Sequence, residues 1–261
     1  MPETTTPCPL CLGMGWRVIL REGRELAVRC GCRAERKLQW EVQACRVPAR
    51  YGHCTVEGFE LWNPRDPTLR QARTRTQEFI DHFPTVDRGL MYMGKVGTGK
   101  THLAVAALRE IVTDKGVSGL YVNFLELVQQ LQMTFERNGG SREEILGPVT
   151  EADILVLDEL GAGKMTEWVR DLLYFVINSR YMTQKVTIFT TNYLDFPQPG
   201  KGGGRGGEAP TGPEPGERWQ ETLADRITDR LRSRLHEMCS VIELRGEDFR
   251  ARSSARTGRG A

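Results

Sequence analysis

Residues Gly94–Thr101 have the sequence GKVGTGKT, which matches G-x-x-x-x-G-K-[ST] at every fixed position. Glycines let the backbone of such a loop curl until its N–H groups face bound phosphates, with no Cβ in the way. A helix that starts at the lysine adds the positive end of its dipole to the same anion site. Lys100 then reaches the β- and γ-phosphates, and the Thr101 hydroxyl ligates Mg²⁺. The pattern predicts a nucleotide site made of Gly94, Lys95, Val96, Gly97, Thr98, Gly99, Lys100 and Thr101.

Two acidic residues end an apolar run downstream of this loop. The run ADILVLDEL covers Ala152–Leu160 and is typical of a buried central strand, with Asp158 and Glu159 near its carboxyl end. One carboxylate there can hold Mg²⁺ through water, and the other can orient and deprotonate an attacking water molecule. We expect Asp158 in the first role and Glu159 in the second. The alternative is that both acids only cap the next element.

Asn192 ends the next expected strand, Val186–Asn192, whose sequence is KVTIFTTN with its preceding lysine. A polar side chain there would lie beside the γ-phosphate and help Glu159 to position water, whereas Thr190 and Thr191 are expected to be ordinary strand residues. Together these features predict an ATPase that uses ATP and Mg²⁺.

Short apolar runs alternate with helical patterns between residues 89 and 194, which indicates an α/β fold with a largely parallel sheet. The expected strands are Gly89–Gly94, Gly119–Phe124, Ala152–Leu160, Val186–Asn192 and Val241–Leu244. The expected helices are a polar segment at 68–83, Thr101–Lys115, a segment at 125–137, Thr166–Met182 and a basic amphipathic helix at Gln220–Met238. A strand therefore precedes the glycine-rich loop and a helix follows it, which is the context that the phosphate motif requires.

Four cysteines near the N-terminus, Cys8, Cys11, Cys30 and Cys32, form a C-x-x-C pair and a C-x-C pair. Four thiolates can close a tetrahedral Zn²⁺ site, and a segment with so few apolar residues needs such a staple. The intervening residues Trp16–Val28 predict a short β-hairpin. Redox-active or buried free cysteines are the alternative.

Three further residues, Cys45, His53 and Cys54, could in principle replace a zinc ligand. Their position between the cysteine-rich segment and the first strand favours a plain structural role. Cys239 is expected in the core, on the last helix.

The length of 261 residues allows one full core and a small accessory module. We expect a cysteine-rich module at 1–46, a connector at 47–88, an ATPase domain at 89–250 and a disordered basic tail at 251–261. Gly and Pro make up more than half of residues 195–217, which predicts a flexible insert with no assigned role. The net charge of +2 argues neither for nor against a nucleic-acid partner.

No apolar run approaches the roughly 20 residues that a membrane helix needs. The first residues also lack the basic and apolar regions of a signal peptide. We therefore expect a cytoplasmic protein with no membrane partner.

The chain resembles the AAA+ ATPases and, within that group, the DnaC/DnaI-type helicase loaders and the related IstB transposition helpers. The resemblance rests on GKVGTGKTHLAVA, ILVLDELG, the TTN strand end, the connector VPARYGHCTVEGF, and DRITDRLRSRLHEM with VIELRGEDFR. It covers roughly residues 45–250 apart from the insert. It implies a three-layer P-loop domain with a parallel sheet and little or no helical lid. It also implies ATP-dependent loading of a replicative hexameric DNA helicase in the primosome, and assembly into a ring or spiral.

The resemblance implies roles for three arginines. An arginine finger from one subunit completes the ATP site of its neighbour, and Arg226 and Arg230 in ADRITDR both match that position. Spaced four apart, they are expected on one face of a single helix, where either could neutralise charge on the γ-phosphate. A basic solvated helix face is the alternative. Arg250 in GEDFR matches the second sensor arginine of the family.

The resemblance also implies a DNA partner and bears on the choice between a loader and its alternatives. In that family, extra helical structure between the second and third strands contributes to the binding of single-stranded DNA, and residues at about 125–150 fill that place here. The cysteine module favours a loader, because DnaI-type loaders carry an N-terminal zinc module that engages the helicase. An IstB-like transposition helper and a non-hydrolysing ATP switch remain the alternatives.

Overall fold

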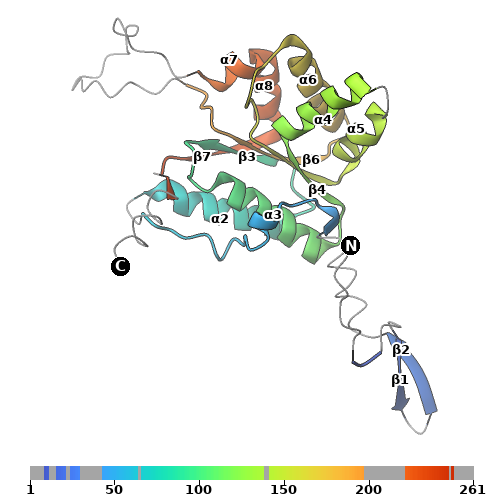
Figure 1. Ribbon diagram of the computed structural model, residues 1–261. Coiled ribbons are helices and arrows are strands. Elements are labelled where there is room, and N and C mark those ends of the chain that lie inside the picture. The colour runs from blue at the N-terminus through green and yellow to red at the C-terminus, as the bar shows by residue number, and fades with distance from the viewer. Residues whose placement is uncertain are drawn as a thin grey trace, which may run out of the picture.

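The computed structural model describes residues 9–11, 16–21, 24–29, 43–63, 66–137, 141–196, 221–246 and 248–249 (Figure 1). Its main sheet has five parallel strands in the order β4–β5–β6–β3–β7. These strands are β3 (Gly89–Gly94), β4 (Gly119–Asn123), β5 (Ile154–Asp158), β6 (Val186–Thr191) and β7 (Cys239–Leu244). The strands β4, β5 and β6 lie on one side of β3, and β7 lies on its other side. The strand order therefore changes direction beside β3. In open α/β sheets, ligands bind outside the carboxyl ends of the strands at such a point.

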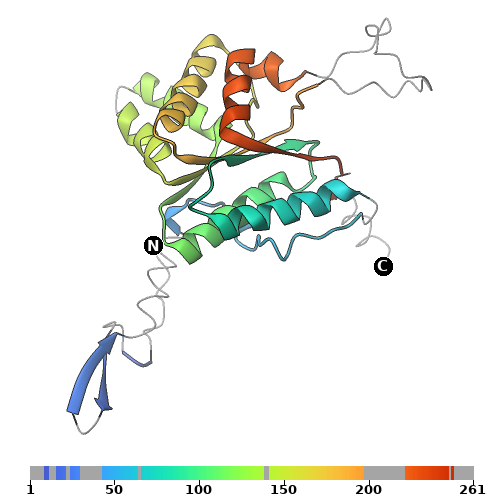
Figure 2. The same ribbon diagram turned by 180° about the vertical axis from the view of Figure 1, so that it is seen from behind.

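Helices cover both faces of this sheet and form a three-layer domain (Figures 1 and 2). Below the sheet in Figure 1 lie α2 (Pro67–His82) and α3 (Lys100–Lys115). The opposite face carries α4 (Phe124–Arg137), α5 (Arg142–Glu151), α6 (Glu167–Met182), α7 (Leu223–Ile227) and α8 (Asp229–Met238). Alternation along each strand supplies both cores: Tyr92 and Val156 belong to the α2–α3 core, while Met91 and Leu157 belong to the other. The predicted α/β fold with a parallel sheet is confirmed.

The segment before β3 is an integral part of this domain. It contains a short 3-10 helix, η1 (Ala49–Tyr51), and then α2. Its side chains Val56 and Phe59 are buried in the same core as α3. The carbonyl of Cys45 accepts a hydrogen bond from the amide of Tyr121 at 2.7 Å, so this segment also runs along the edge strand β4. Cys45 and Cys54 are both buried in that core, as their expected structural role requires.

The N-terminal segment contains the predicted hairpin, in which β1 (Trp16–Arg21) pairs antiparallel with β2 (Arg24–Arg29). Cys11 is buried, but Cys8, Cys30 and Cys32 lie outside the described residues. Within the described ranges, no group of three or more His, Cys, Asp or Glu side chains could hold a metal ion. The zinc site therefore stays a prediction.

The expected single helix at Gln220–Met238 is wrong, because α7 and α8 are separate helices. Thr228 lies between them with φ 82° and ψ 149°, a conformation that no helix contains. The sequence pattern hides this break because the buried side chains keep a spacing of four across it; they are Leu223, Ile227, Leu231 and Leu235. Cys239 is buried as expected, but it begins β7 instead of lying on the last helix.

Most other expected boundaries agree with the structure to within one or two residues. The segment between β4 and β5 forms two helices, α4 and α5, where extra helical structure was expected. Arg250 and residues 197–217 of the expected insert are not among the described residues. In the part of the chain that is described, no helix has both the length and the apolar character needed to cross a membrane.

Candidate nucleotide-binding and hydrolysis site

The glycine-rich loop connects β3 to α3 at the carboxyl edge of the sheet. Gly97 and Gly99 have φ values of 77° and 94°, in the left-handed region that favours glycine. The Lys100 side chain curls back into the loop, where its Nζ donates to the carbonyls of Gly94 at 2.8 Å and Lys95 at 2.7 Å. Lys100 is only 6% exposed. A buried ammonium held by loop carbonyls next to a helix N-terminus is a site suited to a phosphate anion.

Asp158, the last residue of β5, lies directly beside this loop. Its Oδ1 accepts a hydrogen bond from the Thr101 hydroxyl at 2.9 Å, and it also accepts one from the Thr190 hydroxyl. The structure thus brings together Thr101 and Asp158, the two predicted Mg²⁺ ligands. Hydroxyl and carboxylate oxygens are the hard ligands that Mg²⁺ prefers, so these residues fit that ion.

The Asp158 carboxylate has a further partner that the sequence did not reveal. Its Oδ2 accepts a hydrogen bond of 2.7 Å from the hydroxyl of Tyr121 on β4. Burial, reinforced by the negative charge of Asp158, raises the pKa of Tyr121 above its ordinary value. The phenol therefore stays protonated and acts as the donor.

Glu159 follows directly and has an exposed side chain. Its φ of 60° is uncommon for a residue other than glycine, and such strained conformations cluster at functional sites. The backbone amide of Glu159 donates to the Thr190 hydroxyl at 3.0 Å. The side-chain amide of Asn123 donates to Glu159 Oε2 at 3.1 Å. Glu159 is thus held at the same edge of the sheet as Lys100 and Asp158, where a base for water would act.

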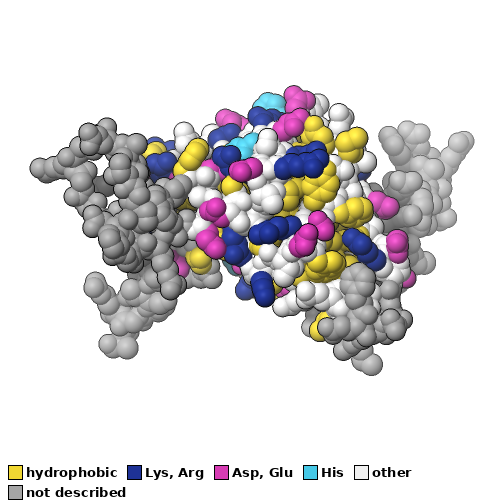
Figure 3. All heavy atoms as spheres, turned by 90° about the horizontal axis from the view of Figure 1, so that it is seen from above, with side chains coloured by type: hydrophobic (Ala, Val, Ile, Leu, Met, Phe, Trp, Pro, Cys, Tyr) yellow, Lys and Arg dark blue, Asp and Glu magenta, His cyan; other side chains and the backbone are white. Residues whose placement is uncertain are grey.

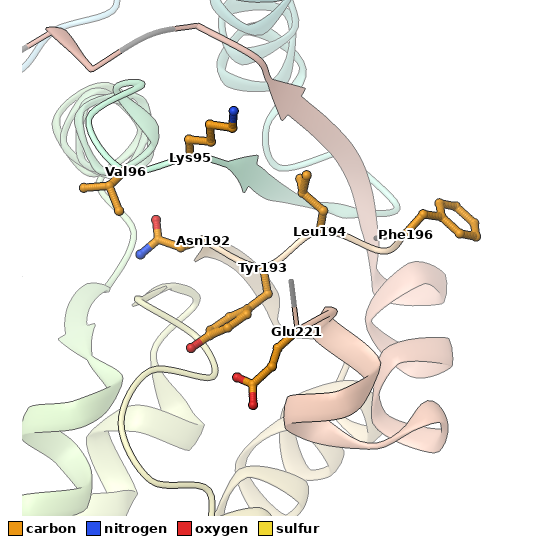
Figure 4. Close-up of a pocket in the computed structure, with 7 residues that line it drawn as sticks. All are labelled: Lys95, Val96, Asn192, Tyr193, Leu194, Phe196 and Glu221. Carbon is orange, nitrogen blue, oxygen red and sulfur yellow. The ribbon is translucent and has the colours of Figure 1, made fainter. Parts of the chain in front are cut away.

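Asn192 follows β6 and lines a pocket of about 440 Å³. Figure 4 shows how this pocket is bordered by the start of the glycine-rich loop, the segment after β6, and Glu221. Its lining residues are Lys95, Val96, Asn192, Tyr193, Leu194, Phe196 and Glu221. Asn192 therefore lies next to the phosphate loop, which is the neighbourhood expected for it.

Arg226 and Arg230 have different environments, because they lie on different helices. Arg226 on α7 donates to the carbonyls of Gly161, at 3.0 Å, and Gly163, in the loop that follows β5. It also forms an ion pair with Glu221 at 3.1 Å. The expectation that the two arginines share one helix face is wrong, since Thr228 interrupts the helix between them.

Arg230 on α8 is exposed. Its guanidinium lies 5.1 Å from the centre of the Tyr174 ring and donates to the Tyr174 hydroxyl at 3.2 Å. Arg226 is thus engaged in holding a loop of its own chain, whereas Arg230 is presented at the surface.

The segment after β7 returns to the phosphate loop. The amide of Phe249 donates to the carbonyl of Gly97 at 3.1 Å, and the Phe249 ring centre lies 5.3 Å from that of Trp62. The Phe59 ring lies so close to Gly99 that a Cβ there would come within 2.5 Å of it. Aromatic side chains from both ends of the domain therefore cover this part of the loop. The predicted sensor arginine, Arg250, is next in sequence but lies outside the described residues.

Sequence reasoning missed Tyr121, Asn123 and Thr190 as members of the site. Asn123 had a detectable signal, because it is a polar residue near the carboxyl end of an expected strand, as Asn192 is. Its place beside Glu159 still depends on β4 lying next to β5, where Asn123 pairs with Asp158. Tyr121 and Thr190 lie inside their strands and offered no such signal.

Comparisons with known proteins agree with this geometry. A family model described as "IstB-like ATP binding protein" matches residues 17–198. The phage-like element PBSX protein XkdC of Bacillus subtilis (strain 168) is 25% identical over 193 residues, which cover 70% of this chain and 71% of that protein. The replicative helicase loader DnaC of Escherichia coli (strain K12) is 26% identical over 156 residues, 60% of this chain and 62% of that protein. The aligned part thus spans less than two thirds of DnaC.

The fold comparison leads to the same group. The crystal structure of the DnaC helicase loader matches with a TM-score of 0.59 and 27% sequence identity, over 76% of this chain and 100% of that chain. This likeness confirms the predicted AAA+ type of α/β fold.

Proposed function

The family match covers more than half of the chain, so the chain belongs to the IstB-like ATP-binding proteins, and on this premise we propose that it is an ATP-dependent loader of a replicative hexameric DNA helicase. The observation that carries the ATP-dependent part of the proposal is the contact between the Thr101 hydroxyl and the Asp158 carboxylate beside the buried Lys100. Relatives named as replicative helicase loaders support the partner class.

In the proposed reaction, Lys100 and the loop amides bind the phosphates of ATP. Thr101 and Asp158 would hold Mg²⁺, which supplies neutralisation of charge on the phosphates. Glu159, fixed through its backbone to Thr190 and through its side chain to Asn123, orients and deprotonates the attacking water. Asn192 contributes a second polar contact for that water from the neighbouring strand. Supporting this division of roles, Asp158 is 1% exposed whereas Glu159 is exposed.

We further propose that the chain assembles into a ring or spiral in which Arg230 acts on the ATP site of a neighbour. Its exposed position on α8 supports this choice over Arg226, whose guanidinium is bonded to Gly161 and Gly163 of its own chain. Arg226 then keeps the loop after Glu159 in place. A finger acting across the interface would make hydrolysis depend on assembly.

Single-stranded DNA, zinc and the second sensor arginine complete the proposal. The two helices α4 and α5 lie between β4 and β5 in the sequence. The resemblance to helicase loaders predicts contact with DNA at this place. Figure 3 shows basic, acidic and hydrophobic side chains intermixed on the face that carries α4 to α8. Because no single charge sign dominates that face, the support for DNA contact is the resemblance. Zinc at Cys8, Cys11, Cys30 and Cys32 rests on the spacing of the cysteines, and the role of Arg250 rests on the resemblance to the family.

The variant Glu159→Gln tests the enzymatic part of the proposal. It keeps the size of the side chain and removes its basic group, so we expect ATP affinity within about twofold of wild type and turnover reduced by 10²–10⁴-fold, the usual range for loss of a general base. ATP binding is measured by fluorescence titration, and phosphate release is measured with helicase and single-stranded DNA present. Glu78→Gln, at an exposed position on α2, is the matched control and should retain wild-type turnover.

A wild-type chain that binds ATP but never hydrolyses it under these conditions would contradict the enzymatic part. It would instead support an adaptor that switches on ATP binding alone. Association with a transposase in place of a helicase would support the transposition-helper alternative.

A further inference from the structure

Tyr121 forms a contact with the acidic pair that the proposed roles above do not use. Strand β4 lies parallel to β5, and the register pairs Tyr121 with Val156 and Asn123 with Asp158. The tyrosine is 4% exposed, and its hydroxyl spans from β4 to Asp158 Oδ2 at 2.7 Å. The edge strand thus delivers a buried hydroxyl to the carboxylate expected to hold the metal.

The two oxygens of Asp158 have different partners. Oδ1 accepts from the hydroxyls of Thr101 and Thr190, whereas Oδ2 accepts from Tyr121. Since Thr101 is itself an expected metal ligand, Oδ1 is the oxygen on the metal side. A donor on each oxygen fixes the rotation of the carboxylate plane, which a bond to one oxygen alone leaves freer. Such second contacts orient metal-binding carboxylates and tune their affinity.

Two residues of the segment before β3 hold Tyr121 in place. Its amide donates to the carbonyl of Cys45 at 2.7 Å. Its ring centre lies 6.4 Å from that of Tyr51, at an interplanar angle of 49°. The segment before β3 therefore fixes both the backbone and the ring of Tyr121. The contacts that hold the Tyr121 hydroxyl against Asp158 thus do not involve the phosphate loop.

We propose that Tyr121 is a positioning residue that orients the Asp158 carboxylate for Mg²⁺ bound with the nucleotide. The proposal rests on the proposed function in one respect, that Asp158 and Thr101 hold this ion. It concerns the affinity for the metal–nucleotide complex, and so it does not require that the chain load a helicase.

A purely structural role for Tyr121 is the competing explanation, and the chain offers a matched control for it. Tyr92 on β3 is also fully buried, and its hydroxyl forms a 2.6 Å hydrogen bond with the Thr76 hydroxyl on α2. Tyr92→Phe removes a buried phenol hydroxyl from the same sheet without touching the acidic pair. It should change stability only.

The experiment compares Tyr121→Phe, Tyr92→Phe and the wild type by fluorescence titration of ATP, first in EDTA and then across a series of Mg²⁺ concentrations. We expect Tyr121→Phe to bind ATP as the wild type does in EDTA, but to need about tenfold more Mg²⁺ for half of the affinity gain. Tyr92→Phe should follow the wild-type Mg²⁺ dependence. Melting temperatures in the same buffers identify any loss of fold.

An unchanged Mg²⁺ dependence in Tyr121→Phe, or an equal shift in Tyr92→Phe, would overturn the positioning role. Wild-type ATP binding that does not depend on Mg²⁺ at all would overturn it as well. Absence of ATP turnover in the wild type would count against the proposed function alone, because the Mg²⁺ shift is read from binding.

Discussion

Thr190 binds both members of the acidic pair through one hydroxyl. That hydroxyl donates to Asp158 and accepts from the amide of Glu159. A hydroxyl has one donor and two acceptor positions, so this arrangement uses its capacity well. A strand threonine thus sets the relative placement of Asp158 and Glu159, the two acids that we propose hold Mg²⁺ and orient water.

Sequence motifs predicted some residues of the site, and others were found only through their contacts in the folded structure. Lys100, Thr101, Asp158 and Glu159 could be predicted because their roles require particular residue types at fixed spacing. Thr190 could not, since a buried threonine is a common strand residue, and only the pairing of β5 with β6 turns it into a partner of Asp158.

We expect His102, on the first turn of α3, to make the free energy of unfolding depend on pH. Its Nε2 lies 2.9 Å from the Thr55 carbonyl, and its ring packs against Phe59 at 5.6 Å between centres. Burial lowers the pKa of His102 below its usual 6.5; the Thr55 contact opposes this, and nearby His53 adds to it. The folded state therefore resists protonation that the unfolded chain accepts. Its stabilising contribution is present above pH 6.5 and is lost as pH falls below that value.

We expect the free energy of unfolding of the wild type to fall between pH 7.5 and pH 5.5, and to fall less in His102→Gln. Urea denaturation at both pH values measures the difference between the two proteins, which cancels contributions from other groups. An equal pH dependence in the variant would rule out His102 as the source.

At the level of elements, hydrophobic periodicity predicted most helices and strands but missed the break at Thr228. Periodicity reports which side chains are buried, and both α7 and α8 bury theirs in the same core. The break itself is a change of backbone conformation at a non-glycine residue with φ 82°, and neither glycine nor proline marks it in the sequence. This error also placed Arg226 and Arg230 on one helix face.

Thr228→Gly should stabilise the protein. A conformation near φ 82°, ψ 149° is nearly restricted to glycine and costs a β-branched residue about 1–3 kcal/mol. Because glycine makes the unfolded chain more flexible, the substitution also lowers the free energy of unfolding by roughly 0.5–1 kcal/mol. We therefore expect a net gain of roughly 1 kcal/mol in the free energy of unfolding, measured by urea denaturation.

The control for this prediction is Thr113→Gly, at an exposed position inside α3, which should lose roughly 0.3 kcal/mol, the difference in helix propensity between threonine and glycine. Destabilisation of similar size in both variants would mean that Thr228 is not strained.

In the whole molecule, the site exists because parallel strands end at one edge of the sheet. Residues 37 positions apart, Tyr121 and Asp158, meet there, as do Asp158 and Thr190 at a separation of 32. The sequence indicated the strands and the parallel class, but the order β4–β5–β6–β3–β7 depends on long-range packing that local patterns do not encode. The phosphate loop was therefore predictable in detail, and the contacts that orient the acids were not.

Deposition of a hexameric helicase on DNA tests the proposed loader function most directly. The chain is mixed with the replicative hexameric helicase of the same host, circular single-stranded DNA and Mg²⁺, with or without ATP, and the helicase retained on the DNA is counted. We expect deposition with the wild type only when ATP is present, and none with Lys100→Ala. Arg230→Ala should bind ATP but deposit little helicase, whereas the exposed control Arg70→Ala should match the wild type. Deposition that is independent of ATP, or its absence with a wild-type chain that binds and hydrolyses ATP, would contradict the loader function.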